Sequence, residues 1–99
     1  MQKDSDEILV EFNNDAGKLL SFLFAKFQKN VQPLNRNKDE NVFQQLQSKY
    51  LYSFKNELEN MAKIQIEKYK GDKAYELNNR LSDSIDRLIN EFVQQIRTL

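Results

Sequence analysis

Carboxylates are the first side chains in this sequence that could do chemistry, and Glu57 is the most conspicuous of them. It falls inside the apolar stripe of a predicted helix, between Phe54 and Met61. A carboxylate in such a place could act as a ligand or a catalytic acid, with Asp83 or Asp86 as a partner across a helical hairpin. Alternatively, Glu57 lies at the edge of the buried face and pairs with a lysine or arginine, or it specifies the register of the helices.

Asn78 invites the same register interpretation. It lies within the apolar seam of the last predicted helix, where a polar side chain can favour one alignment of neighbouring helices over others. Glu57 and Asn78 are therefore the two candidate buried polar residues.

Tyr52 points nearly opposite the apolar stripe of the same predicted helix as Glu57, with Lys49 and Lys55 on that outer face. An aromatic ring among lysines is the minimal arrangement for binding single-stranded nucleic acid, because bases stack on the ring and ammonium groups meet phosphates. Glu59 and Glu67 dilute the positive charge. A solvent-exposed tyrosine with no binding role is the competing interpretation.

Phe22 is an apolar residue outside the apolar arc of its predicted helix. It projects about 60° beyond the apolar arc of the first predicted helix, near Lys18 and Lys29. It is a candidate contact for another protein. If the first helix packs against two neighbours, its arc widens and Phe22 is simply buried.

The stretch around Phe22 is also basic. Lysine and arginine occur there without any acidic residue, at Lys18, Lys26, Lys29, Arg36 and Lys38. Basic residues beside an apolar face raise binding to a membrane surface as a hypothesis. Packing against the other helices explains the same apolar face without lipid, so the sequence favours a core.

Composition excludes several function classes. The chain has no Cys and no His, two Gly, one Pro and a formal net charge of zero. Thiolate chemistry, histidine ligands and a glycine-rich phosphate loop are therefore absent from the sequence. We expect no enzymatic activity, no cofactor and no metal. The acidic opening and the lack of a long apolar run predict a cytoplasmic protein.

These side chains must be positioned by three helices, predicted at about 5–31, 39–70 and 73–98. Apolar residues recur at helical spacing in each, and the seam of the last helix is narrow enough for coiled-coil-like packing. Pro33 ends the first helix. Gly71 can end the second and Asp72 can cap the third. Poor helix formers around Gly17 allow a kink, a fresh helix start at Asp15, or a short strand before it.

The sequence therefore predicts a single all-α domain over residues 1–99, an elongated up-down-up antiparallel bundle of three long helices. Elimination favours a protein-binding role as an adaptor, small chaperone, inhibitor or immunity-type regulator. The wide apolar arc of the first helix suggests self-association into a homodimer. Binding of nucleic acid through the Tyr52 face is the alternative.

Overall fold

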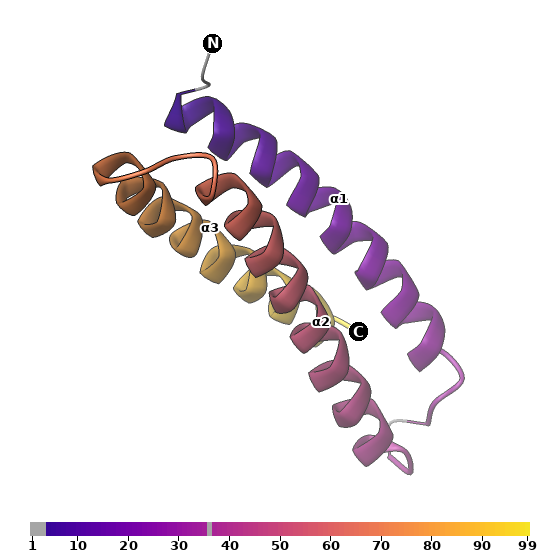
Figure 1. The fold of residues 1–99 in the computed structure, drawn as a ribbon. Coiled ribbons are helices and arrows are strands. Elements are labelled where there is room, and N and C mark those ends of the chain that lie inside the picture. Colours follow the sequence, from indigo (N-terminus) through magenta and orange to yellow (C-terminus); the bar gives the residue numbers. More distant parts are fainter. Residues whose placement is uncertain (1–3, 36) are drawn as a thin grey trace.

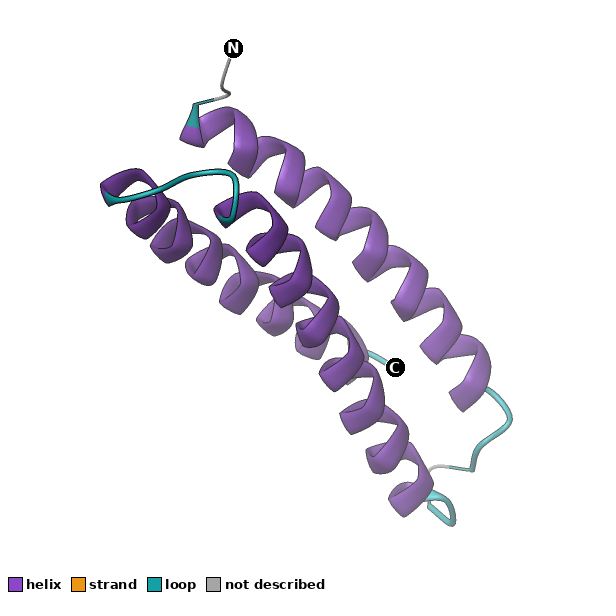
Figure 2. Ribbon diagram, viewed as in Figure 1, coloured by secondary structure: helices purple, strands orange, loops and turns teal. Residues whose placement is uncertain are grey.

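The computed structural model of this protein describes residues 4–35 and 37–99. Three helices follow one another, α1 (Ser5–Val31), α2 (Glu40–Ile66) and α3 (Asp72–Arg97), and no strand occurs among the described residues (Figure 2). They run up, down and up beside one another, and each packs against both others (Figure 1). The result is a rod of 54 × 18 × 17 Å. This confirms the predicted antiparallel bundle of three long helices.

Helix α1 begins where the sequence predicts. The side chain of Asp4, at the N-cap, accepts a hydrogen bond of 2.8 Å from the backbone N–H of Glu7. This bond satisfies one of the donors that the first helical turn leaves without a partner. The helix then continues through Gly17 to Val31 without a break, and no kink is visible in Figure 1. The alternatives of a fresh helix at Asp15 or a short strand before it are therefore wrong.

The turn between α1 and α2 is organised by two residues. The backbone N–H of Asn35 donates to Oδ2 of Asp39 at 3.0 Å, and the N–H of Asp39 donates to the carbonyl of Asn35 at 2.7 Å. Asp39 occupies the N-cap of α2, yet its carboxylate makes no cap bond to the helix. That carboxylate instead holds the turn closed.

The turn between α2 and α3 differs from the prediction. Helix α2 ends at Ile66, four residues before the predicted end at Lys70. Tyr69 is half-buried against the core, and the ammonium of Lys73 lies 4.7 Å from the centre of its ring. The segment that follows α2 is therefore still packed against the core, although it is no longer helical.

Gly71 has a φ of +67°, but it stands at the N-cap of α3 rather than at the end of α2. Asp72 is therefore the first residue of α3 and not its cap. The positive φ explains why glycine stands here, because other residues adopt such a conformation at a cost.

Aromatic rings form much of the core. Phe92 of α3 meets Phe24 of α1 at 6.4 Å and Phe54 of α2 at 5.2 Å between ring centres. One turn further along α1, Phe27 lies 5.4 Å from Phe43 and 5.5 Å from Tyr50 of α2, both edge to face. Such pairs fix the relative placement of the helices as well as burying apolar area.

Helix α2 is rotated relative to the face that the sequence predicts. Its buried residues are Phe43, Phe54, Leu58 and Ala62. Ile64, whose helical spacing from Phe43 and Met61 predicts a place in the same stripe, is instead 59% exposed. Because α2 must face α1 and α3 together, the centre of its buried face moves toward Ala62, and Ile64 turns outward by about 100° from that centre.

The acidic start of α1 makes polar contacts with α3. At the first turn, Asp6 Oδ1 and Arg80 Nη2 of α3 form an ion pair of 2.7 Å. One face of α3 thus meets the acidic start of α1, and Arg87 also reaches Asn13 at 3.4 Å. The chain reverses direction twice, so α1 and α3 run the same way and their first halves lie side by side although they are far apart in the sequence.

Candidate functional site

Phe22 is exposed, as the sequence indicates. It lies near the middle of α1, about 120° from the centre of the buried face of that helix, and 59% of its surface is accessible. The ammonium of Lys26, one turn later, lies over the ring at 5.0 Å from its centre. The competing interpretation, in which a second helix buries Phe22, is therefore wrong for the single chain.

Around Phe22 runs a strip of exposed side chains that we call the α1 outer face. Its members are all exposed, and most point away from α2 and α3, whereas Asp15 and Lys26 lie at the border of the buried face. They are Glu7, Glu11, Asn14, Asp15, Lys18, Ser21, Phe22, Ala25, Lys26 and Lys29. Lys18 and Lys29, the predicted neighbours of Phe22, thus share one face with it.

Tyr52 is also exposed, with 69% of its surface accessible. Lys49 and Lys55 are exposed one turn before and one turn after it on α2. The ammonium of Lys55 lies 4.0 Å from Oε1 of Glu59, so part of the positive charge on this face is compensated. The prediction that Tyr52 points outward between two exposed lysines is confirmed.

Glu57 and Asn78 are both exposed, so their interpretation as buried polar residues is wrong. For Glu57 the cause is the rotation of α2, which places its side chain about 90° from the centre of the buried face. A position at the rim, the alternative, agrees with the structure. Asn78 lines an open groove of about 440 Å³ between α2 and α3, beside Leu81 and Ile85.

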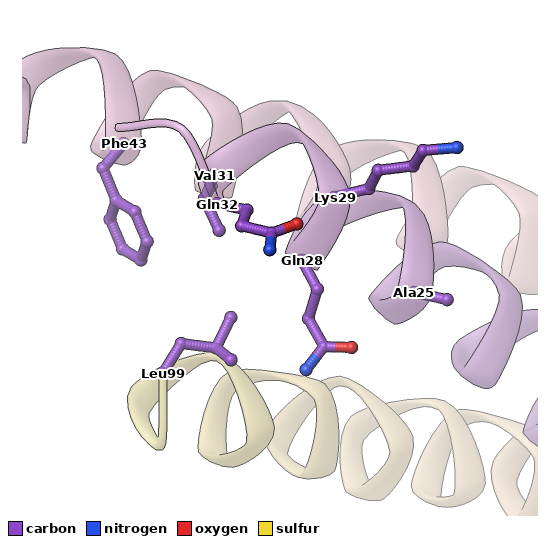
Figure 3. Close-up of a pocket in the computed structure, with 7 residues that line it drawn as sticks. All are labelled: Ala25, Gln28, Lys29, Val31, Gln32, Phe43 and Leu99. Carbon is purple, nitrogen blue, oxygen red and sulfur yellow. The ribbon is translucent and has the colours of Figure 1, made fainter. Parts of the chain in front are cut away.

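A notch at one end of the bundle was not predicted. It measures about 560 Å³ and lies where the last turns of α1 and α3 meet the first turn of α2. Figure 3 shows Val31, Phe43 and Leu99 around the hollow, with the amides of Gln28 and Gln32 at its edge. No local sequence pattern announces this notch, because three segments distant in sequence form it.

Other exposed apolar side chains were missed although the sequence holds a signal for them. Val10 on α1 and Tyr75 on α3 lie outside the apolar stripes when residues are placed at about 100° intervals, and both are largely exposed. The same angular test that singled out Phe22 would have found them.

The chemistry available at these faces is recognition by contact. Residues 4–35 and 37–99 contain no group of three or more carboxylates, histidines or cysteines placed to hold a metal ion. In the same part of the chain, no helix is both long and apolar enough to cross a membrane. What the faces do offer is apolar and charged side chains at fixed spacing on rigid helices.

Comparisons with known proteins give no match to this chain, whether with protein-family models, with curated proteins or with solved structures.

Proposed function

We propose that this protein is a non-enzymatic protein-interaction module, of the adaptor, small-chaperone, inhibitor or immunity-type class, that binds through the α1 outer face. The observation that carries the proposal is the exposure of Phe22 at the centre of a long helix. Aromatic residues are enriched at the energetic centres of protein interfaces, where a few side chains supply most of the affinity. Self-association is one form that such binding can take.

The setting of Phe22 supports this role over that of an incidental surface residue. Single exposed apolar side chains are common and need no explanation. Phe22, however, is flanked within one turn by Lys18 and Lys26, and Lys29 lies two turns on. An apolar centre with a charged rim is the usual composition of a binding surface.

Photo-cross-linking tests the proposal directly. Phe22→benzoylphenylalanine keeps an aromatic ring at position 22 and captures whatever protein touches it in the native cells. Tyr75→benzoylphenylalanine is the matched control, because Tyr75 is 71% exposed on α3 and lies outside the α1 outer face. We expect a discrete protein adduct from position 22 and none from position 75. Equal labelling at both positions, or no adduct at 22, would contradict the proposal.

A second candidate function is binding of single-stranded nucleic acid by Lys49, Tyr52 and Lys55. The observation in its favour is the outward ring of Tyr52 between the two lysines. Affinity for a labelled oligonucleotide would then fall steeply with salt and fall further in the variant Tyr52→Ala. Affinity that is undetectable at low salt would remove this candidate.

The place of action is also untested. That the protein acts in the cytoplasm stays a prediction from the sequence, and fractionation of its native cells would check it.

A further inference from the structure

We infer that the partner of the α1 outer face is a second copy of this chain, bound with the two α1 helices antiparallel. This inference rests on the proposed protein-interaction function and adds the identity and orientation of the partner. It follows from how charge is distributed along α1.

The two halves of α1 carry opposite charge. From residue 4 to residue 15 every charged side chain is acidic, and from residue 16 to residue 35 every charged side chain is basic. On the α1 outer face this gives Glu7, Glu11 and Asp15 before the change of sign, and Lys18, Lys26 and Lys29 after it. The change falls between Asp15 and Lys18, at the middle of a helix of 27 residues.

Such a face is complementary to itself only when the second copy is reversed. A parallel pair would place acidic half against acidic half and basic half against basic half, which is unfavourable. An antiparallel pair related by a twofold axis places each acidic half against the basic half of the other copy. Because the sign changes close to the middle of α1, the two helices then overlap over most of their length.

In the same antiparallel arrangement, the second copy covers the exposed ring of Phe22. With the twofold axis between Asp15 and Lys18, Phe22 of one copy lies level with Glu11 of the second copy, on the same flank of the interface. The second helix thus covers the ring of Phe22, and the twofold axis repeats this contact.

The dimer should be weak and sensitive to salt. A helix of this length, about 40 Å long and about 10 Å wide, covers roughly 400 Å² of each copy, about half of what a stable interface usually buries per partner. Exposed ion pairs contribute little individually and are screened by salt. We therefore expect a Kd in the micromolar range at low salt, rising at least about tenfold at high salt.

Sedimentation equilibrium of two charge-reversed variants tests the inference. The acidic variant, Lys18→Glu with Lys26→Glu, makes positions 7, 15, 18 and 26 all acidic and leaves Lys29 basic. The basic variant, Glu7→Lys with Asp15→Lys, makes the same four positions basic and leaves Glu11 acidic. We expect each variant alone to be monomeric and their equimolar mixture to form a dimer at least as stable as that of the wild type, because the facing positions 7 and 26, and 15 and 18, then carry opposite charge.

A control separates the specific face from general repulsion. Lys49→Glu with Lys63→Glu changes the net charge as much as the acidic variant does, but both positions are exposed on α2. This control should dimerise like the wild type, and circular dichroism should show all four proteins equally helical. A dimer in either charge-reversed variant alone, or a monomeric mixture, would overturn the inference.

A wild type that stays monomeric at every concentration would also overturn the second copy as partner. Photo-cross-linking at position 22 then tests separately whether the α1 outer face binds any protein. An adduct with a different protein would leave the proposed function standing while this inference fails. No adduct would end both.

Discussion

Phe22 and Phe27 show how strongly position on one helix decides the role of a residue. They are five residues apart on α1, yet Phe22 is largely exposed whereas Phe27 is fully buried between Phe43 and Tyr50. The same side chain thus faces solvent at one position and fills the core at the other.

Phe27→Ala should lower the free energy of unfolding by about 3–5 kcal/mol, because it leaves a cavity where two aromatic contacts were. Phe22→Ala, the matched control on the same helix, should change it by less than about 0.5 kcal/mol in dilute solution. Urea titration followed by circular dichroism measures both values. Equal losses in the two variants would mean that Phe22 is buried after all.

The residue-scale features that the sequence predicted correctly are those far from the border of an apolar arc. Phe22 and Tyr52 point well outside it, and small errors in the assumed direction of the core do not change their exposure. Glu57 and Ile64 lie near the border on α2. Their exposure depends on how α2 is rotated about its own axis between α1 and α3. That rotation cannot be predicted from the sequence of α2 alone.

At the scale of the element, the two glycines have opposite structural roles. Gly17 lies inside α1, and a Cβ added there would meet nothing within 4 Å. Gly71 has a φ of +67° and a ψ of −140° immediately before α3, a conformation that few residues other than glycine adopt. A Cβ added at Gly71 would also meet nothing within 4 Å. The two positions therefore differ only in backbone conformation.

Gly17→Ala should therefore raise the free energy of unfolding by roughly 0.5–1 kcal/mol, because alanine favours a helix interior. Gly71→Ala should lower it by about 1–3 kcal/mol through backbone strain. Thermal unfolding of the two single variants side by side gives the signs. Destabilisation by Gly17→Ala would indicate that the middle of α1 is distorted in solution.

The start of α1 depends on a single side chain. Asp4→Ala removes the acceptor for the Glu7 N–H and should cost about 1 kcal/mol, whereas Asp4→Asn retains an acceptor and should cost only a fraction of that. Hydrogen exchange of the amides in the first turn of α1 reports this locally. Unchanged exchange in Asp4→Ala would show that the cap bond is not formed in solution.

Helix ends were harder to predict than helices. The Asp4 cap joins a side chain to an N–H only three residues away. By contrast, α2 ends at Ile66 although the glycine that can end it is Gly71, and the Asp39 carboxylate binds the N–H of Asn35 in the turn instead of capping α2. Helix propensity decides neither outcome, because it fixes neither the turn at which a helix stops nor which nearby N–H a carboxylate binds.

At the scale of the whole molecule, the number of helices and their alternating direction follow from matched lengths and short connections. The notch beside Val31, Phe43 and Leu99 does not, because its shape depends on where three chain segments stop relative to one another. The distribution of charge along the rod is likewise visible in the sequence, but its consequence appears only once α1 is known to be unbroken and to present one outer face.

The shape of the rod makes the mode of self-association measurable by small-angle X-ray scattering. A single chain is 54 Å long with a radius of gyration of 16.0 Å for its Cα atoms. Antiparallel pairing along α1 doubles the mass at low salt while the longest dimension stays close to that of one chain. The cross-section widens, because the second rod lies alongside the first.

Association through the notch at the end of the bundle would instead extend the particle to nearly twice its length at the same mass. Raising the salt concentration should return the scattering curve to that of one chain, since charges along α1 hold the pair. An elongated dimer that survives high salt would place the interface at the end of the rod and exclude the α1 outer face.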